Sequence, residues 1–296
     1  MSNQAKLDKP WSHMGKIGVL LNSIRFEHSV FALPFAYLGM LMAADGLPNL
    51  DKIFWITVAM VAARTLAMGA NRYIDKDIDA KNPRTAVRAL PAGQMKPSDM
   101  LIMCGISLII FMFSAFMLNS LAFALSPIAA LVIVLYSYSK RFTWLSHFWL
   151  GLSDGIAPVG GWIAVSNTIT IEAIILCISV SSWIAGFDLI YQCMDREFDI
   201  QNDLKSIPAR WGNSVSLTLA KIMHVVTVVT LLMVGWIHEL SLLYFTGVAI
   251  ASLLLVYEHS LVKADDLTRV TLAFFNVNGY IALTIFAFTA AAILIN

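Results

Sequence analysis

The stretch Gly69–Gly93, "GANRYIDKDIDAKNPRTAVRALPAG", places carboxylates and arginines in a dense group between two apolar segments. The segment before it reads "IFWITVAMVAARTLAM" (53–68), and the segment after it reads "MLIMCGISLIIFMFSAFML" (100–118). With their adjoining residues, both are long enough to cross the hydrocarbon core of a bilayer, roughly 30 Å thick, as helices. The charged stretch is therefore expected at a membrane surface, between two membrane-spanning helices.

The composition of the whole chain predicts the same class. Hydrophobic residues make up 58% of the 296 residues, charged residues make up 13%, and the mean hydropathy is +0.74. A water-soluble domain of this size could not bury so much apolar surface. We therefore predict an all-α, polytopic membrane bundle with nine transmembrane helices. The nine segments are expected near 17–44, 53–72, 100–118, 121–138, 147–165, 170–192, 215–237, 241–261 and 271–294.

We expect a single domain over 1–296, and we expect that no N-terminal segment of it is a cleavable signal. The N-terminal segment 1–16 is polar, and the apolar run that follows it is longer than the apolar region of a signal peptide. Cys104, Cys177 and Cys193 stand at unrelated spacings within or at the ends of expected helices. This argues against both a disulfide framework and a thiolate metal site.

The distribution of basic residues predicts the orientation in the membrane. The N-terminal segment and the loops after the second, fourth, sixth and eighth expected helices carry lysines and arginines. Of the opposite connections, only the one after the first helix has a basic residue, Lys52. The positive-inside rule then puts the N-terminus and the charged loops in the cytoplasm and the C-terminus outside. We expect a multi-pass protein of the cell inner membrane.

Two acidic clusters stand at equivalent ends of two helices and form a weak internal repeat. The second helix ends in "NRYIDKDID" (71–79), and the sixth ends in "DLIYQCMDREFD" (188–199). We call the polar residues of the first cluster the first motif; they are Asn71, Asp75 and Asp79. Those of the second cluster form the second motif; they are Asp188, Tyr191, Asp195 and Asp199. Positions four apart share one helix face, so each cluster can direct its carboxylates to one point.

The chemistry of these groups favours a metal-bound diphosphate. Carboxylates without thiolate or imidazole neighbours are hard oxygen ligands, which suit Mg²⁺ shared with substrate phosphates. Arg84, Arg88 and Lys140 lie close in sequence to the clusters, and guanidinium groups pair well with phosphate oxygens. The alternative is that both clusters are merely solvated helix ends, which is the better reading of either one alone but not of two at equivalent positions.

These motifs in this order resemble the UbiA-type intramembrane prenyltransferases, and the pattern is most similar to their 4-hydroxybenzoate polyprenyltransferase-like members. The resemblance rests on the first motif with "RTAVRALPAG" after it, on Tyr136-x3-Lys140, and on the second motif with "KSIPARWG" after it. It implies a bundle around a central cavity that transfers a polyprenyl group from polyprenyl diphosphate to an aromatic acid. Such a reaction belongs to respiratory quinone biosynthesis.

The resemblance also implies roles for individual residues. Magnesium is expected on Asn71 and on the four carboxylates that we call the motif carboxylates: Asp75, Asp79, Asp195 and Asp199. Those four are also the expected catalytic residues. The residues expected to contact the diphosphate are Arg84, Arg88, Tyr136 and Lys140. One departure is that Arg72 follows Asn71 where relatives often have an aspartate, and an additional Asp77 lies between two motif carboxylates. The resemblance therefore does not assign the outer ligands of the metal site.

Arg64 stands inside an expected membrane-spanning helix, where an arginine costs about 2.5 to 3.5 kcal/mol on insertion scales. It precedes Asn71 by two helical turns, so it lies on the motif face and roughly 10 Å deeper. The resemblance gives an arginine at this spacing the task of binding the acceptor carboxylate. The alternatives are an interhelical ion pair or a side chain that reaches the headgroups.

Other polar residues within expected helices carry weaker indications. Asp188 and Tyr191 of the second motif and Arg25 in the first helix are further site candidates. Asp154, in the glycine-rich "GLSDGIAPVGG", receives no role from the sequence. The expected partners are the lipid bilayer, a polyprenyl diphosphate and a small aromatic acid, with neither a nucleic acid nor an obligate protein partner.

Alternative functions remain open at this stage. A naphthoate acceptor would change the product to a menaquinone precursor. A secondary transporter also has repeats and buried charges, but its charged residues gather near the bilayer midplane rather than at one face. The aspartate signature of CDP-alcohol phosphotransferases is absent, and magnesium-dependent turnover would exclude a lipid-binding scaffold without catalytic activity.

Overall fold

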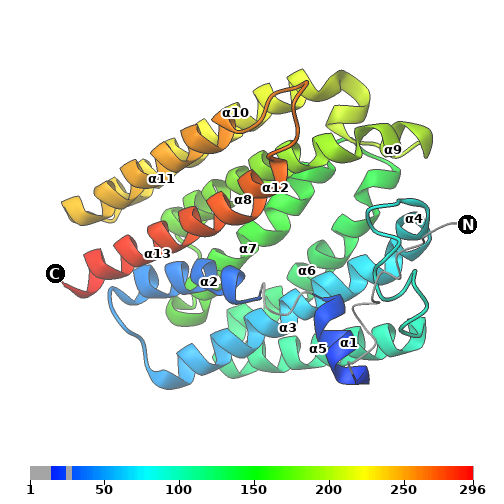
Figure 1. Ribbon diagram of the computed structural model, residues 1–296. Coiled ribbons are helices and arrows are strands. Elements are labelled where there is room, and N and C mark those ends of the chain that lie inside the picture. Colours follow the sequence, from blue (N-terminus) through cyan, green and yellow to red (C-terminus); the bar gives the residue numbers. More distant parts are fainter. Residues whose placement is uncertain (1–14, 25–28, 296) are drawn as a thin grey trace, which may run out of the picture.

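The computed structural model describes residues 15–24 and 29–295, and within these ranges the chain is helical with no strand. Figure 1 shows the helices packed into one elongated bundle. In chain order the elements are α1 (Lys16–Ser23), α2 (Ser29–Ala44), α3 (Leu50–Ile74), α4 (Lys76–Lys81), α5 (Pro97–Leu118), α6 (Ser120–Leu135), η2 (Tyr136–Arg141), α7 (Ser146–Ser166), α8 (Ile171–Tyr191), η3 (Gln192–Asp195), α9 (Arg196–Gln201), α10 (Ile207–Ile237), α11 (Leu242–Ser260), α12 (Val270–Leu272), η4 (Ala273–Val277) and α13 (Asn278–Leu294). Of the η segments, η2 and η3 are 3₁₀ helices and η4 is a π-helix.

The prediction of a polytopic all-α membrane protein is confirmed. Among the described residues, eight helical segments are long and apolar enough to cross a membrane, and the shorter apolar helix Leu33–Ala44 lies within α2. The predicted ranges agree with the observed helices to within a few residues, except at the N-terminal ends of the first and seventh. The seventh begins at Ile207 rather than near 215, with a kink at Gly212, whose φ is 84°.

The prediction of one continuous helix over 17–44 is wrong. Helix α1 ends at Ser23 and α2 begins at Ser29, and Figure 1 shows the two running in different directions. The interval between them contains Arg25, Glu27 and His28 in sequence. These residues lie outside the described ranges, and the observed end of α1 lies at Ser23, followed by the non-helical Ile24.

Helix α7 packs against its neighbours through glycines. A Cβ atom added at Gly161 would overlap the Ala36 carbonyl of α2, and one added at Gly39 of α2 would overlap the Pro158 carbonyl of α7. On the other side, Gly151 lies against the Ser181 carbonyl of α8. Small residues allow such close approach, which drives helix association where lipid removes the hydrophobic advantage. Helix α7 is thus fixed between α2 and α8.

Two asparagines join the turns at the end of the bundle opposite the motifs. Asn119 caps α6 by accepting a hydrogen bond from the Ala122 N–H at 2.8 Å, and its amide donates to the Ile163 carbonyl of α7 at 2.7 Å. Asn167 ends α7 in a left-handed conformation and accepts from the Leu121 N–H at 3.2 Å. These bonds satisfy backbone groups that helix ends leave free, and they set α7 relative to α5 and α6.

Candidate active site

A cavity of about 1370 Å³ runs through the bundle, lined by residues of α2, α3, α5, α6, α7, α8 and α13. Its walls are apolar for much of their length, and its polar residues gather where α3 and α8 end. The cavity-lining residues include all but one of the site residues that the sequence predicts: Arg64, Asn71, Asp75, Asp79, Arg84, Arg88, Tyr136, Lys140, Asp188, Tyr191, Asp195 and Asp199. Arg25 lies outside the described residues. The two motifs therefore share one site. We call the part of the cavity where α3 and α8 end, and where the motif residues gather, the motif end.

Arg84 connects the two motifs. Its Nε and Nη2 atoms donate to the two carboxylate oxygens of Asp195 at 3.1 and 2.5 Å, and its Nη1 donates to the Tyr191 hydroxyl at 3.1 Å. Asn82 supports the pair by donating to Asp195 at 3.3 Å while accepting from the Arg84 backbone N–H. Burial lowers the pKa of Arg84, but the hydrogen bond and charge of Asp195 outweigh it and the pKa is raised. The arginine stays charged.

The other three motif carboxylates also have basic partners. Arg88 Nη1 lies 2.7 Å from both carboxylate oxygens of Asp79, and Lys140 Nζ lies 3.8 Å from Asp199. Asp199 is 1% exposed and also accepts from the Gln192 amide at 2.9 Å. Each predicted diphosphate-binding cation thus already faces a predicted metal ligand, so positive and negative charges alternate at the motif end.

Asp75 is held by a residue to which the sequence assigned no role. Arg141 lies 2.9 Å from its carboxylate, and Arg141 also donates to the Ile74 and Ser137 carbonyls at 2.8 Å. On the opposite side, Asn71 donates to Asp75 at 2.8 Å. Burial raises the pKa of Asp75, against the lowering by Arg141. The sequence offered one signal for Arg141, its place directly after Lys140.

His147 is a second residue that the sequence did not indicate. It is fully buried at the start of α7, and its Nδ1 lies 2.7 Å from the Asp188 carboxylate. Its Nε2 accepts a hydrogen bond from the Ile207 backbone N–H at 3.3 Å. Because Nε2 is the acceptor, the ring proton is on Nδ1 and is donated to Asp188. This chain of bonds fixes Asp188 against α7 and α10.

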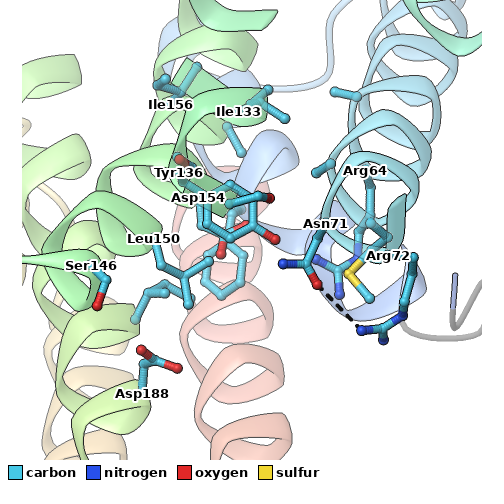
Figure 2. Close-up of a pocket in the computed structure, with 18 of the residues that line it drawn as sticks. Arg64, Asn71, Arg72, Ile133, Tyr136, Ser146, Leu150, Asp154, Ile156 and Asp188 are labelled. Carbon is cyan, nitrogen blue, oxygen red and sulfur yellow. Dashed lines mark hydrogen bonds between the residues drawn. The ribbon is translucent and has the colours of Figure 1, made fainter. Parts of the chain in front are cut away.

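The departure from the family pattern at Arg72 has a local explanation. Arg72 is buried, donates to the Ser23 carbonyl of α1 at 3.2 Å, and reaches the Asn71 side-chain oxygen at 3.4 Å, the bond drawn in Figure 2. It thereby orients Asn71 and joins α1 to α3. Asp77 is exposed and does not line the cavity. The additional carboxylate is therefore outside the site.

The donor atoms at the motif end fit magnesium. They are carboxylate and amide oxygens from the two motifs, the hard ligands that Mg²⁺ prefers. In the described ranges no three His, Cys, Asp or Glu side chains enclose a single point. Magnesium is commonly held by one or two carboxylates together with waters and substrate phosphates, rather than by an all-protein cage. The arrangement suits a metal that binds together with a diphosphate.

Arg64 lies deeper in the cavity than the motif end, two helical turns before Asn71 on α3 (Figure 2). Its Nε is buried and has no hydrogen-bond partner, and its guanidinium forms no ion pair with the described residues. The expected alternative, an interhelical ion pair, is not formed within 4 Å among the described residues, although Asp154 of α7 lies near enough for the two charges to interact. A fixed positive charge is presented to the cavity.

Comparison with known proteins gives the same architecture and the same family. The model of the UbiA prenyltransferase family matches residues 32–293. The chain is 30% identical over 249 residues to a protein named 4-hydroxybenzoate octaprenyltransferase from Francisella tularensis subsp. mediasiatica, covering 84% of this chain and 87% of the relative. A protein of the same name from Aliivibrio fischeri is 28% identical over 257 residues, covering 87% and 90%.

Solved structures share the fold. A UbiA homolog from Aeropyrum pernix K1 superposes with a TM-score of 0.82 at 31% identity, covering 89% of this chain and 97% of that one. A UbiA homolog from Archaeoglobus fulgidus, bound to DMAPP and Mg²⁺, gives a TM-score of 0.71 at 18% identity, covering 93% and 98%. With the family model matching nearly the whole length, the chain belongs to the UbiA prenyltransferase family.

Proposed function

We propose that this protein transfers a polyprenyl group from polyprenyl diphosphate to 4-hydroxybenzoate, with Mg²⁺, in respiratory quinone biosynthesis. The observation that carries the proposal is the shared cavity: both acidic motifs, three of their basic partners (Arg84, Arg88 and Lys140) and Arg64 line one space of about 1370 Å³. The relatives named 4-hydroxybenzoate octaprenyltransferase support the choice of acceptor.

The motif end suits the diphosphate of the donor. When the allylic C–O bond breaks, its electron pair stays on the diphosphate, whose negative charge grows. Arg84, Arg88 and Lys140 provide positive charge at that place, and Tyr136 provides a hydroxyl that lines the same cavity. Fixed charges of this kind are often the largest contribution to catalysis. Bound magnesium would supply Lewis-acid stabilisation of the same leaving group, held by Asn71 and the motif carboxylates.

The deeper part of the cavity suits the acceptor. Arg64 offers a guanidinium fork that has no hydrogen bond or ion pair with the described residues, and a carboxylate is its natural bidentate ligand. An aromatic acid bound there would hold its ring below the motif end, where the prenyl cation forms. The apolar walls exclude water from that cation, which would otherwise be hydrolysed.

The protein spans the membrane several times, and we propose that its motif end faces the cytoplasm. The support is the asymmetry of basic residues, which places Lys and Arg in the N-terminal segment and in every loop at the motif end. The inner membrane of the cell is the location that this orientation and quinone biosynthesis both imply.

A defined assay tests the proposal. Purified protein in lipid nanodiscs is supplied with Mg²⁺, prenyl diphosphates of several lengths, and a panel containing 4-hydroxybenzoate and 1,4-dihydroxy-2-naphthoate. We expect prenylated 4-hydroxybenzoate, no turnover after chelation with EDTA, and recovery when Mg²⁺ is restored. Selective prenylation of the naphthoate would instead assign a menaquinone-type acceptor, and transport of solute without product would favour a transporter.

A further inference from the structure

The charged side chains that line the cavity fall into two groups. Those in the first group each have a hydrogen bond or ion pair within the protein: Arg72, Asp75, Asp79, Arg84, Arg88, Lys140, Asp188, Asp195 and Asp199. The second group consists of Arg64 and Asp154, which have neither with the residues that the structure describes. Within the described ranges, the cavity therefore contains one cation and one anion that have no hydrogen bond or ion pair, although their charges interact with each other.

Arg64 and Asp154 lie at similar depth on two different helices. Arg64 is ten residues before the end of α3 at Ile74, about 15 Å along the helix axis from the motif end. Asp154 is eight residues after the start of α7 at Ser146, about 12 Å from the same end. Figure 2 shows both side chains with Asn71 and Tyr136 in one part of the cavity.

A purely structural role does not account for Asp154. An ion pair joining α3 to α7 would bring a carboxylate oxygen within 4 Å of the Arg64 guanidinium, and no such pair forms. Helix α7 is already positioned by the close contacts of its glycines with α2 and α8. Charged groups within a membrane span are costly and as a rule mark function.

We propose that Asp154 binds the phenolic hydroxyl of the acceptor, while Arg64 binds its carboxylate. This proposal rests on the proposed function and specifies which acids the site accepts. The ligand that fits has a hydrogen-bond acceptor at one end, a hydroxyl donor at the other, and a rigid ring between them. A 4-hydroxybenzoate has this form, whereas benzoate lacks the donor and an ester or amide lacks the charge.

The same contact activates the ring. As Asp154 accepts the hydroxyl proton, electron density moves from the oxygen to the ring carbon ortho to it, because the para position is occupied by the carboxylate. That carbon forms a C–C bond with the prenyl C1 as the C–O bond to the diphosphate breaks, its electron pair leaving with the diphosphate. The ring carbon then gives its proton to the released diphosphate, and Asp154 returns the hydroxyl proton. Atoms and charge balance.

The test separates the two ends of the acceptor. For wild type and Asp154→Asn, one measures kcat/KM for 4-hydroxybenzoate and 4-hydroxybenzamide, and the inhibition constant of benzoate. Loss of a hydrogen bond to a charged group corresponds to roughly a ten- to hundredfold decrease. We expect this decrease in Asp154→Asn for both hydroxylated compounds, with benzoate inhibition and the KM of the prenyl diphosphate unchanged within about twofold. Asp51→Asn, the same change at an exposed site outside the cavity, is the matched control.

Each outcome decides one question. If wild type prenylates no hydroxylated acid, the proposed function is wrong, whatever the variant does. If wild type is active and Asp154→Asn keeps its kcat/KM for 4-hydroxybenzoate, or weakens benzoate equally, the role of Asp154 is wrong. Should the variant fail to fold, the wild-type protein still gives an answer in an equilibrium-binding measurement without prenyl diphosphate. Benzoate, which has no hydroxyl proton to donate, should bind roughly tenfold or more weakly than 4-hydroxybenzoate, and equal affinities of the two acids would overturn the proposal.

Discussion

At the scale of single residues, Asp195 links two distant segments of the chain through its bonds to Arg84. The spacing of four residues places it on the same helix face as Asp199, and its position before a basic loop indicates a cation nearby. The actual partner, Arg84, comes from a loop 111 residues earlier in the chain. For the same reason Arg141 and His147 were missed, since their contacts join distant segments. Asp154 received no role because a charge without a partner is recognised only when its surroundings are known.

Removal of one motif carboxylate should stop catalysis without unfolding the protein. We expect Asp75→Ala or Asp195→Ala to lower kcat by roughly a hundredfold or more, because each removes a metal ligand and disturbs the charge that stabilises the diphosphate. Turnover is measured with saturating Mg²⁺, and the melting temperature checks folding. Retained activity in both variants would refute the metal–diphosphate assignment.

Substitution of Arg64 should change the kinetic constants of the acceptor and not those of the prenyl diphosphate donor. Arg64→Ala should raise the acceptor KM and lower acceptor kcat/KM by roughly ten- to a hundredfold, the equivalent of a charged hydrogen bond. The KM of the prenyl diphosphate should change little, because Arg64 lies away from the motif end. Arg64→Lys should recover only part of the activity, since lysine lacks the planar fork. Equal losses for both substrates would make Arg64 structural.

At the scale of helices, hydropathy predicts the length and the number of the membrane-spanning helices well. The reason is that the thickness of the bilayer selects apolar runs of about 20 residues. Hydropathy does not predict where one apolar run contains two helices, as at α1 and α2. It also does not reveal which glycines are contact points. In α7, Gly160 and Gly161 are neighbours in sequence, yet only Gly161 faces α2 closely.

These neighbouring glycines provide a matched pair for a stability experiment. Gly161→Ala should lower the free energy of unfolding by about 1 to 3 kcal/mol, because its methyl group would overlap the Ala36 carbonyl and force α2 away from α7. Gly160→Ala meets nothing within 4 Å and should be neutral or slightly stabilising, since alanine favours helices by about 1 kcal/mol. Thermal unfolding in detergent measures both, and equal melting temperatures would contradict the packing argument.

At the scale of the whole molecule, the cavity depends on how the helices assemble. The two motifs are more than a hundred residues apart in sequence, and only the repeat in their position suggested that they meet. The central cavity was predicted only through the resemblance to a known family, because hydropathy alone does not distinguish a packed bundle from a hollow one. Orientation is different, since it is encoded in loop charges that sequence displays directly.

Orientation can be tested with fused reporters. A reporter attached after Asn296 should report from the non-cytoplasmic side, and the same reporter inserted after Gly93, in the loop between α3 and α5, should report from the cytoplasm. The two fusions control for each other, because both must fold to be informative. Signals from the same compartment would mean that an odd number of membrane crossings does not separate the two positions.

The difference in depth between the motif end and Arg64 has a consequence for the sequence of events in a turnover. A water-soluble acid that travels to Arg64 from the aqueous side passes the ion pairs where the diphosphate is expected to sit. A donor already in place would close that route, so the acid should enter first. A non-cleavable donor analogue should then inhibit competitively toward prenyl diphosphate and uncompetitively toward the acid. Mixed inhibition toward the acid would mean that it reaches its pocket by another path, such as sideways from the lipid.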